Sequence, residues 1–170
     1  MPTYERFEDL PVWQQAANLY ETVDAFLSKA TRGVSRSFAD QLERAALSVS
    51  NNIAEGFERG TTKELLAFLY IARGSAGETR SMCCLLERKP PLADLKSEIS
   101  NLKLMAESCS RQLRGWAEHL QNSDIAGPRH LNDTVRQCLD TRRRASDFQK
   151  RLHDALPPDH PLRRAEETTR

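Results

Sequence analysis

The sequence of 170 residues has few helix breakers, with only 7 glycines and 8 prolines, so much of the chain can be helical. It lacks any apolar run near the ~20 residues that a membrane-spanning helix needs. Its first residues, MPTYERFEDLPVWQ, lack the apolar core of a signal peptide. We therefore expect a cytoplasmic protein without a membrane partner. The net charge of +1 by itself indicates no nucleic acid either.

The sequence also lacks the patterns of metal and cofactor sites. Its four cysteines (Cys83, Cys84, Cys109 and Cys138) form no Cys-x-x-Cys pair. Cys83 and Cys109 fall on apolar helix faces, where a free cysteine behaves as a small hydrophobe. There is no Glu-x-x-His motif of a di-iron bundle, no His-x-x-x-His and no phosphate-binding loop. We expect reduced thiols and neither a metal nor a cofactor.

Four segments carry apolar residues at the 3-4 spacing of amphipathic helices. The first begins after Asp9, with a proline in its first turn. The second spans residues 38–57 and stops at Gly60. The third opens with a capping box, Thr61-x-x-Glu64, and ends at residues 89–91. The fourth spans residues 92–120. The inward residues predicted for the first two helices are Trp13, Ala17, Tyr20, Val23 and Leu27, then Phe38, Leu42, Ala45, Val49, Asn52 and Gly56.

No segment alternates with the period of two that indicates a strand. The pattern predicts an all-α fold, an up-down four-helix bundle over residues 1–122. Residues 123–156 are predicted to be a linker and a C-terminal amphipathic basic helix, and residues 157–170 a disordered tail. Residues 129–151 hold seven Lys/Arg against three Asp, a net charge of +4, whereas residues 1–122 have a net charge of −1.

A row of polar residues follows the second helix beside its apolar seam. We call it the polar stripe: Gln41, Arg44, Ser48, Asn52, Glu55, Gly56 and Arg59. It could be a solvated face, a buried polar seam that fixes helix register, or a ligand site. Gly56 permits close packing against the small residues of the third helix, which are Ala72, Gly74, Ser75, Ala76 and Gly77.

The stretch SNNIAEGFERG (residues 50–60), with QLERAALS before it and FLYIARGSAGE after it, resembles a known family. The family comprises four-helix-bundle proteins encoded in intervening sequences of bacterial 23S ribosomal RNA genes. It includes the accessory variability determinant of diversity-generating retroelements. The resemblance covers about residues 5–122, including FEDLPVWQQA. It implies a homopentameric ring without enzymatic activity, which in retroelements contacts a reverse transcriptase and its template RNA through basic surfaces.

Two sets of basic residues are candidates for nucleic-acid binding. Arg73 and Arg80 are seven residues apart, as are Lys96 and Lys103, and a ring of five copies would repeat each pair into a basic belt. The second set is Arg142, Arg143 and Arg144. For both sets the alternative is an ordinary solvated helix face. Four apolar residues off the seam of the third helix indicate a subunit interface: Phe68, Ile71, Met82 and Leu85.

One enzyme-like pattern occurs, Arg114-x4-His119, which resembles the motif of helical-bundle ribonucleases of the HEPN class. Three functions therefore remain open from the sequence. The chain could be a non-enzymatic assembly that binds RNA, a reverse transcriptase or both. It could be an oligomeric scaffold that binds only protein. It could also be a ribonuclease that uses Arg114 and His119.

Overall fold

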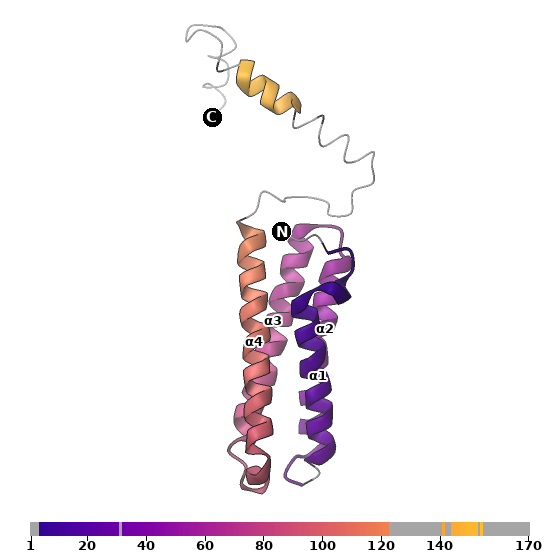
Figure 1. Cartoon of the computed structure of the whole chain (residues 1–170), viewed down its shortest axis with the longest axis vertical. Helices are drawn as coiled ribbons and strands as arrows, with labels where there is room; N and C mark the ends of the chain where they lie inside the picture. Colours follow the sequence, from indigo (N-terminus) through magenta and orange to yellow (C-terminus); the bar gives the residue numbers. More distant parts are fainter. Residues whose placement is uncertain (1–3, 31, 123–140, 142–143, 153, 155–170) are drawn as a thin grey trace. The chain divides into compact units, whose positions relative to one another are not determined.

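The computed structural model describes residues 4–30, 32–122, 141, 144–152 and 154. Its elements, in chain order, are η1 (Phe7–Asp9), α1 (Pro11–Lys29), α2 (Arg36–Glu58), α3 (Thr62–Leu86), η2 (Pro90–Leu95) and α4 (Lys96–Gln121). The helices α1 to α4 run alternately up and down beside one another (Figure 1). The described part of the chain contains no strand. The all-helical bundle predicted from the sequence is therefore confirmed.

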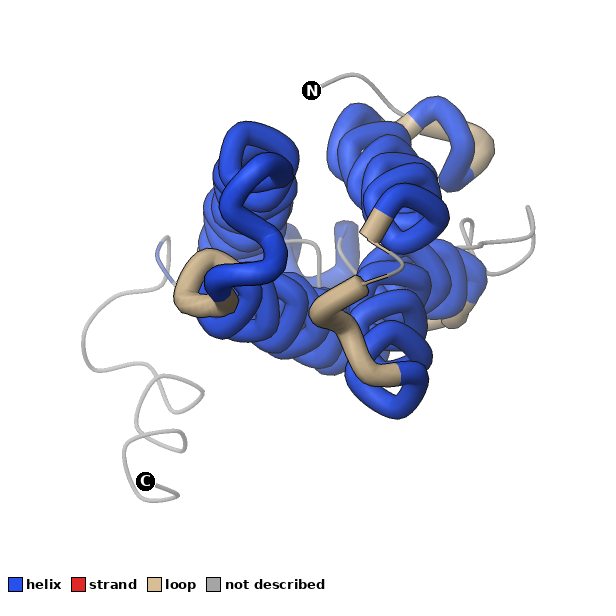
Figure 2. Tube along the Cα trace, turned by 90° about the horizontal axis from the view of Figure 1, so that it is seen from below, coloured by secondary structure: helices blue, strands red, loops and turns tan. Residues whose placement is uncertain are grey.

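Each long helix packs against two others, so that α1 contacts α2 and α4, and α3 contacts α2 and α4. Seen along the bundle, the four helices surround a common core (Figure 2). The core consists of buried aliphatic side chains from all four helices, among them Leu19, Leu42, Leu69 and Leu102. None of the described helices has the length and apolar character that crossing a membrane requires.

The helix starts follow from local chemistry. Ser35 caps α2, because its hydroxyl accepts a hydrogen bond from the Phe38 amide at 3.4 Å. Thr61 caps α3 in the same way by accepting from the Glu64 amide at 3.2 Å, and its hydroxyl donates to the Glu64 carboxylate at 2.8 Å. Pro11 occupies the first turn of α1, where its missing N–H has no helical partner to lose. The Thr61 cap is confirmed, but the Glu64 carboxylate reaches back to the Thr61 hydroxyl and not to its backbone N–H, as a full capping box would require.

The predicted inward face of α1 is wrong by about one residue. The buried residues of this helix are Val12, Ala16, Leu19, Val23 and Phe26, of which only Val23 was predicted. The predicted Trp13, Tyr20 and Leu27 pack against the edge of the core and stay partly exposed. The apolar stripe of α1 is wider than one seam. Phe26 and four aliphatic or small residues point inward, while Trp13 and Tyr20 lie partly exposed at the rim, as amphipathic aromatic residues often do.

Two other predicted helix boundaries differ from the structure. A 3-10 segment, η2, precedes α4, so the α-helix begins at Lys96 rather than at Leu92, although Leu92 is buried as predicted. Gly60 does not end α2 with a left-handed turn. The helix ends at Glu58, and the cap residue Arg59 is extended, with φ −69° and ψ 145°. On α2, Asn52 is only half-buried, and Ile53 takes the fully buried place beside it.

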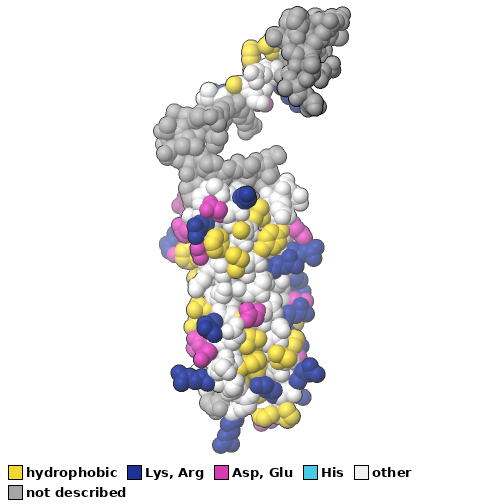
Figure 3. Space-filling view, turned by 180° about the vertical axis from the view of Figure 1, so that it is seen from behind, with side chains coloured by type: hydrophobic (Ala, Val, Ile, Leu, Met, Phe, Trp, Pro, Cys, Tyr) yellow, Lys and Arg dark blue, Asp and Glu magenta, His cyan; other side chains and the backbone are white. Residues whose placement is uncertain are grey.

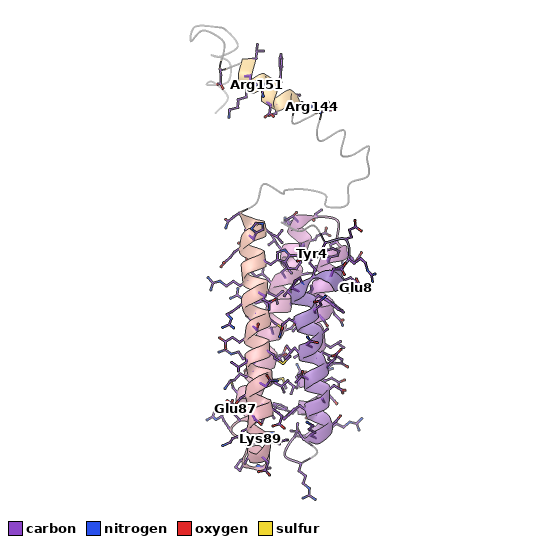
Figure 4. All side chains as sticks on the ribbon, viewed as in Figure 1. Tyr4, Glu8, Glu87, Lys89, Arg144 and Arg151 are labelled. Atoms are coloured by element: carbon purple, nitrogen blue, oxygen red, sulfur yellow. The ribbon has the colours of Figure 1, made fainter. Side chains whose placement is uncertain are left out.

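A contact between two loops closes one end of the bundle. Lys89, after α3, donates to the carbonyl of Gly33 in the α1–α2 loop at 3.1 Å. Its ammonium also lies 4.8 Å from the centroid of the Phe38 ring, a cation–π contact. Figure 4 shows Lys89 and Glu87 at this end. Gly33 has φ +90°, which only glycine adopts readily, and Pro91 lies against it.

The described residues beyond the bundle, 141, 144–152 and 154, belong to a unit separate from it. Residues 144–152 are helical, and all nine side chains are exposed, including Phe148 and Leu152. Figure 4 labels Arg144 and Arg151 on this helix. Arg142, Arg143 and the predicted tail at 157–170 lie outside the described residues. The domain division at residue 122 stays a prediction.

We expect Gly33→Ala to destabilise the bundle by about 2 kcal/mol. Its φ of +90° disfavours any side chain with a Cβ, and a Cβ built there would lie 2.9 Å from the Cβ of Pro91. Gly60→Ala is the matched control, because nothing lies within 4 Å of a Cβ at that position. Urea unfolding measures both variants. Equal stability of Gly33→Ala and the wild type would contradict the loop geometry.

Candidate functional site

The polar stripe lies where α2 and α3 face each other, and its first part is an exposed network. The side-chain amide of Gln41 donates to the carboxylate of Glu78 on α3 at 2.5 Å. Arg44 in turn donates to the amide oxygen of Gln41 at 3.0 Å. Gln41, Arg44 and Glu78 all reach solvent, so these bonds compete with water. This part of the stripe is a solvated face.

The middle of the stripe is a half-buried chain of hydrogen bonds between the two helices. The amide of Asn52 donates to the hydroxyl of Ser48 at 2.8 Å and to its carbonyl at 2.7 Å. The hydroxyls of Ser48 and Ser75 are 2.9 Å apart across the helix interface. Ser75 also donates to the carbonyl of Ile71 at 3.2 Å. These polar groups therefore satisfy one another, as half-buried groups must.

The last part of the stripe combines an exposed ion pair with a close helix contact. Arg59 donates to Glu55 at 2.6 Å, and the side chains are 46% and 51% exposed. This bond raises the pKa of Arg59. The guanidinium also lies 5.1 Å from the centroid of the Phe68 ring. Gly56 is buried, and a Cβ there would lie 2.7 Å from the Cβ of Phe68.

The small residues of α3 do not meet Gly56 as the sequence suggested. Because α2 and α3 are antiparallel, Gly56 lies level with Leu65 and Phe68. Gly74 and Gly77 are exposed, and nothing lies within 4 Å of a Cβ built on either. The stripe is therefore divided. Its middle joins α2 to α3, whereas Gln41, Arg44, Glu55 and Arg59 reach solvent in the single protomer.

Ser75 and Glu78 of α3 are the hydrogen-bond partners of the stripe, and neither was predicted in that role from the sequence. No signal in the sequence gives these partners, because only the alignment of the folded helices, with Gly56 opposite Phe68, brings Ser48 near Ser75 and Gln41 near Glu78. Of the four apolar residues expected at an interface, Ile71 and Leu85 are exposed. Met82 is 8% exposed and belongs to the core, and Phe68 is half-buried against α2.

The candidate basic belt of α3 and α4 is partly neutralised. Lys103 donates to Glu87 at 2.6 Å, which lowers the pKa of Glu87 and raises that of Lys103. Arg80 lies 3.4 Å from Glu107. Arg73 is half-buried and Lys96 is exposed. Two of the four belt residues are therefore engaged with carboxylates, which reduces the charge they can offer to a phosphate.

The Arg114-x4-His119 pattern does not form a composite site. At ~100° per residue, positions five apart on an α-helix point about 140° away from each other. The guanidinium of Arg114 donates to the carboxylate of Glu118 at 2.6 Å, which raises the Arg114 pKa. His119 is exposed near the end of α4. Nothing in this geometry directs both side chains at one phosphate.

The described cysteines are free thiols, and two of them are buried. Burial raises the pKa of Cys83 to about 12 and that of Cys109 to about 11, so neither forms a thiolate at neutral pH. Cys84 is exposed, and Cys138 lies outside the described residues. No group of three or more His, Cys, Asp or Glu in the described part of the chain could hold a metal ion.

One surface feature was not found from the sequence. A shallow depression on α2 is lined by Asp40, Glu43, Arg44 and Leu47. The hydroxyl of Tyr20 on α1 donates to Glu43 at 3.5 Å, and burial together with the nearby carboxylates raises the Tyr20 pKa. The acidic residues of both helices are visible in the sequence, but only the α1–α2 pairing brings them together.

We expect Ser75→Ala to cost about 1 kcal/mol of unfolding free energy, because it leaves the half-buried Ser48 hydroxyl without its partner across the interface. Glu55→Ala should cost measurably less in a dilute protomer, because its ion pair is half exposed. Urea unfolding, at protein concentrations low enough to keep the copies apart, measures the free energy of unfolding of both variants. A larger loss for Glu55→Ala would mean that something covers the end of the stripe.

Comparison with protein-family models matches residues 8–115 to the 23S rRNA-intervening sequence proteins. No curated protein matches the sequence. The matched segment includes the whole polar stripe, its partners on α3 and most of α4, and it amounts to well over half of the chain. With the all-helical bundle described above, it identifies this chain as a member of the 23S rRNA-intervening sequence protein family.

Proposed function

We propose that the protein is a non-enzymatic assembly factor, whose bundles join side by side into a ring that binds RNA. The observation that carries the proposal is the separation of charge between the two halves of the bundle. Residues 4–61, with α1 and α2, hold six Lys/Arg and nine Asp/Glu, a net charge of −3. Residues 62–121, with α3 and α4, hold nine Lys/Arg and seven Asp/Glu, a net charge of +2.

Because the two halves carry net charges of opposite sign, the acidic half of one copy is attracted to the basic half of the next copy. Such a head-to-tail contact closes into a ring when the rotation between copies divides a full turn. The acidic half offers Asp24, Asp40 and Glu43 around the depression that contains Leu47. The resemblance to the intervening-sequence proteins implies five copies.

Binding of RNA is proposed to rest mainly on the C-terminal basic segment. Arg144, Lys150 and Arg151 are exposed on the helix at 144–152, and Arg142 and Arg143 precede them in the sequence. In a ring this segment is repeated by each copy, which multiplies weak phosphate contacts. Arg73 and Lys96 are proposed as secondary contacts, because Arg80 and Lys103 are already engaged with carboxylates.

A more specific version of this proposal is that the assembly also binds a reverse transcriptase. It is suggested by the resemblance to the accessory variability determinant. The ribonuclease alternative is disfavoured because Arg114 is paired with Glu118 and points away from His119. The scaffold that binds only protein remains as an outcome of the binding test below.

Light scattering should give a mass several times that of the 19.3 kDa chain at micromolar concentration. Asp24→Lys together with Asp40→Lys should dissociate the assembly, because the acidic face then repels the basic half of the next copy. Asp94→Lys with Glu118→Lys is the matched control, since it makes the same charge change on the basic half. A monomeric wild type would reject the ring.

Changing Arg142, Arg143 and Arg144 to Ala should weaken RNA binding and flatten its salt dependence. Each phosphate that is no longer neutralised lowers the slope of log affinity against log salt by ~0.7–0.9. Filter binding at several salt concentrations measures this, with Arg73→Ala and Lys96→Ala expected to have the smaller effect. His119→Ala, in a parallel cleavage assay, should change nothing. Absence of binding by the wild type at any salt would leave only the protein scaffold.

A further inference from the structure

The outer surface of α3 carries a second stripe with the spacing of a coiled-coil seam. Seven of its residues lie on α3 and the eighth, Arg88, in the turn that follows the helix. They follow one another at 3-4-3-4-3-4-3 spacing, and every one of them is exposed. We call them the outer stripe: Glu64, Ala67, Ile71, Gly74, Glu78, Ser81, Leu85 and Arg88. The buried residues of α3, such as Leu69, Ala72 and Ala76, lie on the opposite face and serve the core. No described helix of the same protomer covers the outer stripe.

The outer stripe has features that a solvated helix face does not need. Ile71 is 51% exposed and Leu85 is 48% exposed. Figure 3, which views the bundle from behind, shows apolar side chains reaching the surface between charged ones. Gly74 weakens the helix relative to alanine. Nothing lies within 4 Å of a Cβ built on it, so the described protomer gives no packing reason for a glycine there.

Residue size alternates regularly along the outer stripe. Counted as heptads, one position of each repeat is long (Glu64, Ile71, Glu78, Leu85), and the other is small until the last (Ala67, Gly74, Ser81, then Arg88). When two such helices pack antiparallel, each layer pairs one residue from the long positions of one helix with one residue from the small positions of the other. A long side chain would therefore meet a small one in every layer but the outermost.

A second copy of α3, antiparallel and centred on Ala76, satisfies this pattern along the whole stripe. Ile71 would lie on Ser81 of the second copy, Leu85 on its Ala67, and Glu78 on its Gly74. At each end Glu64, in the first turn of α3, would lie near Arg88, which follows the last turn of the second helix and carries the opposite charge. We infer that the outer stripe is a self-complementary docking surface for a second copy of this chain, paired through α3 about a two-fold axis.

The small positions explain how two exposed helices could come close enough to bind. Helices pack ~8–10 Å apart depending on the side chains at the contact, and small residues permit the short end of that range. The open space above Gly74 then receives Glu78 of the second copy, whose carboxylate already accepts a hydrogen bond from Gln41. The two Glu78 carboxylates approach each other near the axis, and their repulsion keeps the pairing reversible.

This contact is isologous, so it joins copies in twos and is distinct from the head-to-tail contact of the proposed ring. The ring uses the acidic and basic halves, whereas the pairing uses only the outer face of α3. The pairing would exist between single bundles if no ring formed. With a ring, it would join two rings to each other.

Sedimentation of the full-length chain tests the pairing through three variants. Gly74→Leu should halve the mass of the assembly, because the new side chain fills the space that Glu78 needs, yet it should raise the melting temperature of the protomer, because leucine favours helix. Ile71→Lys should weaken pairing on the order of 100-fold, since the interaction occurs twice per pair. Leu104→Lys is the matched control, with a leucine that is 62% exposed on α4.

Glu78→Gln should have the opposite effect and strengthen the pairing, because it removes the like charges at the axis. A stronger pairing in Glu78→Gln would distinguish specific docking through this face from a general loss of solubility. A weakened pairing in Glu78→Gln, or a mass unchanged by Gly74→Leu, would overturn the inference.

Disulfide trapping tests the antiparallel geometry. Ile71→Cys and Ser81→Cys are made separately in a chain with Cys84→Ser and Cys138→Ser. Oxidation of the two proteins mixed should give a linked dimer, whereas each alone should not, since its two copies of the new cysteine lie about 15 Å apart along the axis. Linkage of either protein alone would indicate parallel helices and overturn the pairing. If Gly74→Leu instead converts a ring into monomers in the sedimentation experiment, this face is the contact between neighbours in the ring. That result would reject the two-fold pair but not the ring.

Discussion

The close approach of α2 and α3 at Gly56 is the constraint on which the rest of the bundle depends. A methyl group at this position would lie 2.7 Å from the Cβ of Phe68. With this level fixed, the antiparallel helices have one register, which places Ser48 beside Ser75 and Gln41 beside Glu78. The polar stripe is the consequence of that register. The Ser48 and Ser75 hydroxyls would lose their bond to each other if either helix slid by one residue, although each keeps a partner within its own helix.

The charges of the bundle show why net charge is a poor guide to binding. In the sequence Arg80 and Lys103 are two unpaired cations, but the fold brings Glu107 and Glu87 to them. In the same way, a total charge near zero conceals a net charge of −3 on residues 4–61 and of +2 on residues 62–121. The total charge of a bundle therefore does not describe the charge that each pair of helices carries.

Much of the fold could be predicted from the sequence, because helix capping and apolar periodicity are local. The Thr61 cap, the four helices and the buried Leu92 follow from residues within a few positions of each other. The inward face of α1 was misjudged because Trp13 and Tyr20 satisfy the same spacing as a core seam but lie at its rim. The partners of the polar stripe could not be predicted, since they depend on how two helices align. The open surface at Gly74 likewise depends on which helix lies beside it.

The bond between Lys89 and Gly33 has a consequence for the order in which the chain folds. It joins residues 56 positions apart, across the loops of two helical hairpins, α1–α2 and α3–α4. A contact of such long range can form only after the four helices have come together. Contacts made after the folding barrier act mainly by slowing unfolding. We therefore expect the Lys89–Gly33 contact to act mainly by slowing unfolding, so that it lengthens the lifetime of the assembled bundle more than it speeds folding.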